Sequence, residues 1–506
     1  MNRTSKIILG ILGGVIALAF LFVFFFNDYL ENKIKSSIKK ELDQSFIQYS
    51  EIDVDVFNRN AAVSKLRFQR GKFNVRAENI QLDAFDYYDY FVNHKITIGK
   101  IVLESPDITI EPSDSLPNKR KKADKNFKEN ITIKNFHLTN GTLKIKDSAK
   151  VQGSLYVNLK ELQVKGIRVN AGTLKGKLPF EYEHVALQSD TIFFGLDAEH
   201  NLSVEGFSFK DDQLNLENIH ITPKYSKSEF DRRQKIEKDR MVLGINNVKI
   251  NNFNWDFIND TLLLQSPKII VNNANWELYR NKLIADPTTT KPLYSKMLRE
   301  MGIKLDFGSV KIKNSQIVYE ERVHNDRPSA LFKFSKIDGS ISNLTNVGMH
   351  KKDFLDTKLQ AKAFFMDEAK ISMNLAFNVA NLKDEFHVSG DLFNLSAADM
   401  NVILKPEMNI LAHGQIQSVY YNFYGNDNAA EGETQLKYED FKIEILRKDG
   451  QKKNKLLSGL VNLVVNNKTK NKNLTQPDLR IERDKTKSFW NYFWLCIRAG
   501  ALKSFI

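Results

Sequence analysis

The stretch ITIKNFHLTNGTLKIKD, residues 131–147, carries the pattern that decides the fold. Its apolar residues stand at offsets 0, +2, +5, +7, +12 and +14, and Asn140-Gly141 occupies offsets +9 and +10. The same spacing, mostly apolar, begins eight times along the chain, at Ala61, Ile96, Ile131, Leu162, Leu202, Leu243, Leu264 and Leu305. Successive copies start 21 to 41 residues apart, which indicates an irregular repeat and not a fixed-period solenoid.

The spacing within each copy predicts β-structure, because side chains two positions apart point to the same face of a strand. A two-residue turn at Asn140-Gly141 would place Leu138 opposite Leu143 and Phe136 opposite Ile145, with all four on one apolar face. Asn-Gly suits a type I′ turn, since both central residues need a positive φ. The odd step from +2 to +5 predicts a bulge or bend. Each copy is therefore expected to be a bent strand followed by a returning strand.

The N-terminal region predicts a membrane anchor. Residues 7–26, IILGILGGVIALAFLFVFFF, form an uncharged and almost wholly apolar run of 20 residues, long enough to cross a bilayer as a helix. Arg3 and Lys6 precede it, so the positive-inside rule places residues 1–6 in the cytoplasm and the rest of the chain on the far side. A cleaved signal peptide is the competing interpretation, but the run lacks a small-x-small site and is too long.

Two other segments predict amphipathic helices. Residues 27–49 carry apolar side chains at intervals of four and could lie against lipid head groups or cap the end of a β-sheet. Residues 487–506 place Trp490, Phe493, Trp494 and Ile497 at i, i+3, i+4 and i+7. This last stripe predicts a helix that contacts a membrane or partner, or one that plugs the open end of the sheet.

Between these helices, residues 50–446 are expected to form one repetitive β-domain. Three charged inserts interrupt it, at residues 113–130, 223–240 and 286–302, and a Lys/Asn-rich segment follows at 447–486.

Charge and cysteine content narrow the environment. Lys+Arg number 74 against 61 Asp+Glu, a net charge of +13 that would suit anionic lipid or nucleic acid, or a solvated basic surface with no partner. No zinc finger, helix-turn-helix or RNA-binding signature is present, so no nucleic-acid partner is predicted. The single cysteine, Cys496, allows no internal disulfide, which fits a bacterial periplasm better than an extracellular animal protein.

Signatures of catalysis are missing from the sequence. The nine histidines form no H-x-x-x-H pair, and no G-x-S-x-G, Walker, G-x-G-x-x-G or C-x-x-C pattern occurs. We therefore predict that the protein is not an enzyme and has no catalytic residues, metal ligands or cofactor.

These features resemble a known family. The order of anchor and β-repeats, phrases of the 131–147 kind, and the later FHVSGDLFNLSAADMNVILKPEMNILAHGQIQ at 386–417 resemble the AsmA-like proteins, relatives of TamB. The inserts at 223–240 and 286–300 resemble those of members from Bacteroidota-type bacteria. The resemblance implies a single-pass protein of the bacterial inner membrane whose bulk lies in the periplasm. It also implies phospholipid transport between the inner and outer membranes, with a possible outer-membrane or periplasmic partner at the distal end.

The expected fold is mainly β: an N-terminal transmembrane helix, a long repetitive antiparallel β-sheet curled into an open apolar groove, and short terminal amphipathic helices. An apolar sheet face must be buried, and curling around acyl chains would bury it, as would a closed barrel or a two-sheet sandwich. The side chains expected to line a lipid groove are Leu66, Phe68, Ile101, Leu103, Phe136, Leu138, Leu143, Ile145, Ile167, Val169, Phe207, Phe209, Ile245, Val248, Ile250, Val310, Ile312 and Ile317.

Two other functions also fit the sequence. A membrane-tethered scaffold or assembly factor for outer-membrane proteins would bind polypeptide at a sheet edge. A surface-exposed, adhesin-like repeat protein would need neither lipid nor client.

Overall fold

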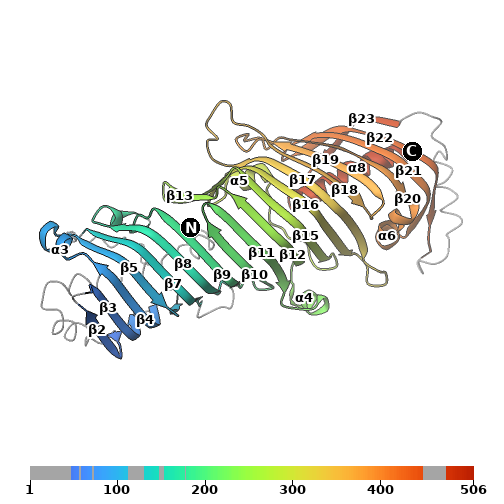
Figure 1. The fold of residues 1–506 in the computed structure, drawn as a ribbon. Coiled ribbons are helices and arrows are strands. Elements are labelled where there is room, and N and C mark those ends of the chain that lie inside the picture. Colours follow the sequence, from blue (N-terminus) through green and yellow to red (C-terminus); the bar gives the residue numbers. More distant parts are fainter. Residues whose placement is uncertain are drawn as a thin grey trace. The chain divides into compact units, whose positions relative to one another are not determined.

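The computed structural model describes residues 47–55, 58–70, 73–111, 130–146, 153–176, 178–447 and 474–505. This part of the chain is mainly β and divides into two compact units. Unit 1 comprises Met1–His220 with Asp256–Leu262, and unit 2 comprises Ile221–Trp255 with Leu263–Ile506. Figure 1 shows the order of their strands.

The predicted anchor at residues 7–26 lies outside the described residues, as does almost all of the predicted helix at 27–49. Within the described ranges, no helix is both long enough and apolar enough to cross a bilayer.

Unit 1 is a sheet in which neighbouring strands follow the chain closely. Its elements are β1 (Ile47–Gln48), β2 (Glu51–Asp55), β3 (Asn60–Arg70), β4 (Phe73–Phe85), α3 (Tyr87–Asn93), β5 (Ile96–Glu104), β6 (Asp107–Ile110), β7 (Ile131–Ile145), β8 (Leu155–Val169), the 3-10 turn η1 (Thr173–Lys175), β9 (His184–Phe194), β10 (His200–Lys210) and β11 (Gln213–Pro223), whose last residues belong to unit 2. The strands β2, β3 and β4 pair in sequence, and so do β7, β8, β9 and β10, all antiparallel. Both β5 and β6 lie between β4 and β7, antiparallel to β4 and parallel to β7.

Unit 2 repeats this plan and adds helices. Its elements are α4 (Lys227–Arg233), β12 (Asp239–Asn251), β15 (Lys268–Asn281), α5 (Tyr294–Arg299), β16 (Lys304–Arg322), β17 (Ala330–Thr345), β18 (Thr357–Phe365), β19 (Ala369–Phe377), β20 (Phe386–Ser396), α6 (Ala397–Met408), β21 (Ile410–Gly425), β22 (Ala429–Ile445), β23 (Leu474–Glu482) and α8 (Phe489–Phe505). The short strands β13 (Asn254–Ile258) and β14 (Thr261–Ser266) stand where the chain passes between the units.

The sheet of unit 2 pairs in the order β12, β15, β16 and then β17 to β23 in sequence. Its strands are antiparallel except that β14 and β15 run parallel to β16. The prediction of a β-fold is therefore confirmed, but the prediction of a wholly antiparallel sheet is wrong. Parallel pairs arise where one copy of the repeated apolar pattern lies beside the next copy.

The phrase at residues 131–147 forms one bent strand and not a hairpin. β7 runs from Ile131 to Ile145 and pairs along its whole length with β8. Asn140 has a φ of 53°, whereas Gly141 is not among the residues with positive φ, so the two positive values that a type I′ turn requires are not present. The predicted turn is wrong here, because the second half of the phrase pairs with β6 and β8 instead of folding back.

The bend still produces the predicted common face. One residue with positive φ shifts the alternation by one position, so Leu138 and Leu143 lie on the same side, 0% and 1% exposed. The alternation shifts a second time between Ile133 and Phe136, so that both side chains are buried on the same face. This second shift lies opposite Gly166 of β8, which has a φ of 66°. The bulge or bend predicted between offsets +2 and +5 is thus confirmed in this copy.

In other copies the residue at offset +9 either bends a continuous strand or begins a turn. Ser105, Asn273 and Asn314 adopt φ values of 47°, 53° and 44°, and the paired chain continues in the same direction past each of them. In β15 and β16 the two bends are adjacent, and Asn314 Nδ2 donates to Asn273 Oδ1 at 2.9 Å. In contrast, Asp211 and Asp212, with φ of 50° and 60°, separate β10 from β11, so the predicted two-residue turn is confirmed in that copy.

We expect Asn140→Val to destabilise unit 1 by about 1–2 kcal/mol, because a β-branched residue is strained at positive φ. Asn140→Gly is the matched control and should change stability little, since glycine adopts this conformation readily. Urea unfolding curves of the two variants would measure the difference. Equal midpoints would show that the bend does not depend on residue 140.

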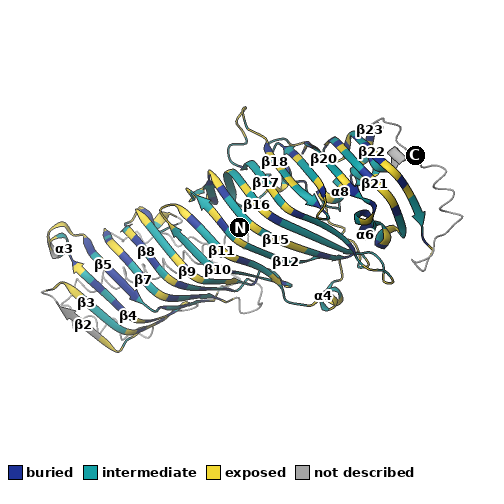
Figure 2. Ribbon diagram, turned by 45° about the vertical axis from the view of Figure 1, so that its right-hand side comes forward, coloured by how far each residue is buried: buried dark blue, intermediate teal, exposed yellow. Residues whose placement is uncertain are grey.

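Rows of apolar side chains cross the sheet of unit 1. Leu103, Leu138 and Leu162 face one another across β5, β7 and β8, and each is less than a tenth exposed. The buried residues of β3 to β8 form one hydrophobic cluster with Phe180. Figure 2 shows the alternating bands of buried and more exposed residues along these strands.

Candidate functional site

An apolar face remains partly exposed in unit 2, across β12, β15, β16 and β17. We call it the open face and define it by four rows of side chains that oppose one another in register. The rows are Ile250–Ile269–Val310–Ile341, Val248–Val271–Ile312–Gly339, Leu243–Trp276–Ile317–Phe334 and Met241–Leu278–Tyr319–Phe332. Ile245 lies on the same face, opposite Ala274.

The bends at Asn273 and Asn314 keep this face continuous. Without them the side chains beyond the bend would point to the opposite side, because alternation in a strand has a period of two. With them, Val271 and Trp276 of β15 lie on one face, as do Ile312 and Ile317 of β16. The asparagines therefore position the site although they do not line it.

Exposure distinguishes the open face from the core of unit 1. Apart from Val248 and Ile269, its side chains are only half-buried, and Trp276 is 37% exposed. A contiguous apolar surface of this kind is uncommon on a monomeric soluble protein and usually marks an interaction site.

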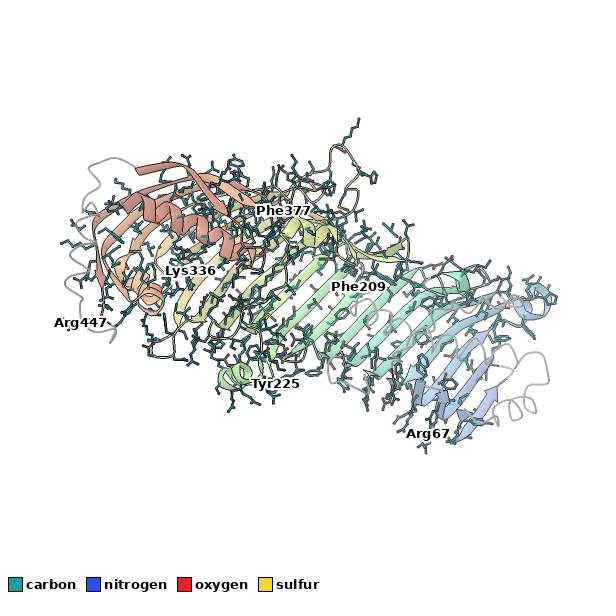
Figure 3. The ribbon with its side chains drawn as sticks, turned by 180° about the vertical axis from the view of Figure 1, so that it is seen from behind. Arg67, Phe209, Tyr225, Lys336, Phe377 and Arg447 are labelled. Carbon is teal, nitrogen blue, oxygen red and sulfur yellow. The ribbon has the colours of Figure 1, made fainter. Side chains whose placement is uncertain are left out.

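Further along the same rows, α8 covers the sheet. The first row continues across β18 to β21 through Leu359, Leu375, Val388 and Phe423. On these strands Phe489, Tyr492 and Cys496 of α8 are buried. In Figure 3 the reddish helix crosses in front of the strands of this C-terminal part. Phe386 packs edge-to-face on Phe489, with ring centres 5.2 Å apart. Ala397, Met400 and Ile403 of α6 are buried in a neighbouring cluster.

The C-terminal stripe predicted from the sequence is thus divided between two environments. Phe493 and Ile497 are partly buried against the core cluster beneath α8, consistent with a helix that covers the sheet. Trp490 and Trp494 stay 48% and 39% exposed. Trp494 also packs edge-to-face on Phe332 of the open face, at 6.1 Å between ring centres. The open face therefore ends at an aromatic border formed by α8.

A charged row bounds the open face at one end of the strands. Arg280 follows Leu278 on the same face, and its Nε donates to Asp239 Oδ1 at 2.6 Å. Glu237 is buried and pairs with Lys282, with Nζ 3.1 Å from Oε2. The Tyr319 hydroxyl donates to Glu321 Oε2 at 2.6 Å, and burial, with the Glu321 carboxylate, raises the pKa of that hydroxyl. The apolar rows thus pass directly into paired charges.

Glu407, near the end of α6, lies beside this row. Burial and, to a smaller extent, the Glu321 carboxylate raise the pKa of its carboxyl to about 7, although Arg498 and Lys282 oppose the shift. Its backbone carbonyl lies 3.4 Å from His324 Nε2. Glu407 is therefore partly protonated near neutral pH.

We expect Glu407 to make unit 2 less stable as the pH rises. Its folded pKa lies above the ordinary value, so its stabilising contribution is complete below about pH 4.5 and is lost as the pH rises through about 7. Solvent screening of a partly exposed carboxyl leaves on the order of 1 kcal/mol, or ~2–4 °C in melting temperature between about pH 5 and pH 8. Glu407→Gln should remove this part of the pH dependence in thermal unfolding curves. A dependence that is unchanged in the variant would exclude Glu407 as its source.

The lipid-groove residues predicted from the sequence fall into three groups. Ten are buried within the cluster of unit 1: Leu66, Phe68, Ile101, Leu103, Phe136, Leu138, Leu143, Ile145, Ile167 and Val169. Phe207 and Phe209 of β10 are half-buried. Six lie together on the open face: Ile245, Val248, Ile250, Val310, Ile312 and Ile317.

Sequence reasoning missed several members of the open face, including Trp276, Leu278 and Tyr319. Offsets +12 and +14 of the copies at Leu264 and Leu305 would have found them. The residues from β17 carry no comparable signal, because that strand follows the last copy of the phrase.

Comparison with family models and with curated protein sequences identifies no relative. No model of a protein family matches the chain, and no curated protein matches its sequence significantly. The similarity to AsmA-like proteins therefore remains a prediction. Among the described residues, no three histidine, cysteine, aspartate or glutamate side chains are grouped so that they could hold a metal ion.

Proposed function

We propose that the protein binds phospholipid acyl chains on the open face of unit 2 and supports lipid transport between two membranes. The observation that carries this proposal is the set of in-register apolar rows that remain half-exposed on β12, β15, β16 and β17. We further propose, from the apolar run at residues 7–26 and the AsmA-like resemblance, that it is anchored in a bacterial inner membrane and faces the periplasm.

The energetics favour an apolar ligand. Each methylene buried contributes about 0.8 kcal/mol, so even four methylenes laid along a row contribute roughly 3 kcal/mol. The four rows form an apolar surface that no charged side chain interrupts. Such a surface suits an extended and chemically uniform chain. The part of the same sheet that α8 covers also binds apolar groups, since Phe489 and Tyr492 of α8 are buried there.

The borders of the open face suit an amphipathic ligand. Trp494 on α8, which packs on Phe332, is a large and rigid contact surface at one side. The row that contains Arg280, Asp239 and Glu321 offers charged partners at the strand ends. Acyl chains would lie on the rows while a head group stays near charge and water.

Photo-crosslinking in cells tests the proposal. A benzophenone amino acid in place of Ile312 should crosslink to phospholipid, whereas the same substitution at Lys311 should not. Lys311 is the matched control, because it is the preceding residue of the same strand and is exposed on the other face. Mass spectrometry of the purified adducts would identify the lipid. Crosslinking to protein alone, or equal lipid yields at both positions, would exclude lipid binding on this face.

A further inference from the structure

Two neighbouring connections of unit 2 project beyond one end of its strands. Residues 346–356 join β17 to β18, and residues 378–385 join β19 to β20. Because these strands are antiparallel, both connections lie at the same end of the sheet. Figures 1 and 2 show the first of them extending above the strands.

The two connections are held together and present leucines outward. Asn378 Nδ2 donates to the Phe354 carbonyl at 3.2 Å and to Asp356 Oδ1 at 2.9 Å. Phe354 is packed against the core, whereas the adjacent Leu355 is 64% exposed. Leu382, in the second connection, is 79% exposed. Leucines at such positions are fixed outward by the anchoring of their neighbours.

Helix α5 supports the second connection. Arg299 donates to the carbonyls of Val379 and Asn381 at 2.8 and 3.1 Å. Both Arg299 and Ser295 also donate to Asp384 Oδ1, at 2.8 and 2.7 Å. Since Val379 is fully buried, the loop is fastened at its base while its tip remains in solvent.

Lysines surround the exposed leucines. Lys351, Lys352 and Lys383 are exposed, and none of them forms an ion pair within the described part of the chain. Two acidic neighbours are occupied, since Asp356 accepts from Asn378 and Glu385 accepts from Asn381. Asp353 is the remaining exposed carboxylate of the first connection.

We propose that this tip, formed by residues 346–356 and 378–385, docks on an anionic phospholipid bilayer and inserts Leu355 and Leu382 into its interface. Each leucine side chain that enters the interfacial region of a bilayer contributes favourably to binding by itself, and lysines beside it attract the lipid phosphates. Two leucines cover far less than the roughly 800 Å² per partner of a standard protein interface. The surface therefore suits a membrane better than a protein partner, and this inference is independent of acyl-chain binding on the open face.

An environment-sensitive fluorophore tests the inference on the full chain held in phosphatidylcholine nanodiscs. Leu382→Cys can be labelled selectively with a nitrobenzoxadiazole maleimide, because Cys496 is buried and burial raises the pKa of its thiol to about 12. Vesicles of equal parts phosphatidylcholine and phosphatidylglycerol should shift the emission to the blue and raise its intensity severalfold. The same label at Asp326→Cys, in the connection at the opposite strand ends, should not respond.

Variants make the result decisive. A second labelled protein, Leu355→Cys, should respond like Leu382→Cys. Combining Lys351→Gln, Lys352→Gln and Lys383→Gln in either labelled protein should weaken its response severalfold. No spectral change at either leucine position, an equal change at position 326, or an equal response to pure phosphatidylcholine vesicles would overturn the proposal. Leu355→Ser with Leu382→Ser should leave lipid crosslinking at position 312 unchanged, so this test and that of the open face fail separately.

Discussion

Leu138→Asp is expected to unfold unit 1. Leu138 is fully buried at the centre of β7, opposite Leu103 and Leu162. An aspartate there would bury an unpaired carboxylate among apolar side chains, which costs on the order of 4 kcal/mol or more and exceeds what a marginal domain tolerates. Hydrogen exchange of the β7 and β8 amides would detect the loss of protection within unit 1 specifically.

Thr132→Asp is the matched control for this variant. Thr132 lies on the same strand but is half-buried and faces Arg168 of β8, which already pairs with Glu183, so a carboxylate there meets charged side chains and solvent instead of an apolar core. Its stability should change by about 0.5 kcal/mol or less, as is usual for surface substitutions. If both variants kept native exchange protection, the apolar face of unit 1 would have to be accessible to water in solution.

Ile312→Asp is expected to leave unit 2 folded and to deplete its bound phospholipid severalfold. Ile312 is half-buried on the open face, where a carboxylate can reach water instead of being trapped in a core. The cost to stability should stay near 1–2 kcal/mol. The negative charge would nevertheless interrupt the row that continues from Val271 to Gly339 and repel acyl chains from it. Ile245→Asp, on β12, should have the same effect.

Lys311→Asp is the control, because it places the same charge one residue away on the opposite face of β16. Circular dichroism melting curves and phospholipid mass spectrometry on the same preparations would report folding and lipid content together. Folded Ile312→Asp and Ile245→Asp proteins with normal lipid content would show that the open face is not a lipid path. Unfolding of both would show instead that this face is a closed core in solution.

The sequence by itself was sufficient to predict the β-class of the described chain and the common face of its apolar residues. Leu138 and Leu143 share a face in a hairpin and also in a strand with one bend, so their offsets predict the face whichever structure forms. The helix at the C-terminus followed equally well from the spacing of Trp490, Phe493 and Ile497. Local periodicity is a property of the chain alone, and these features depend on nothing else.

Whether the chain turned or bent was decided by the tertiary structure. Asn140 and Asp211 occupy the same offset and both adopt positive φ, yet Asn140 bends a continuous strand and Asp211 begins a turn. The difference lies in the following residue and in the strands available on each side, and β7 gains backbone partners in both β6 and β8 by continuing. Long-range pairing of this kind has no signal within a window of 17 residues.

Exposure of the apolar face was decided in the same way. Leu138 and Ile312 both occupy offset +7 of their copies, but Leu138 is fully buried and Ile312 is half-exposed. Their local sequences predict the same inward-facing position, because a strand's alternation specifies which side chains share a face and not what covers that face. Packing partners come from distant parts of the chain, as α8 does for β19 to β22, and only the folded molecule determines which rows they reach.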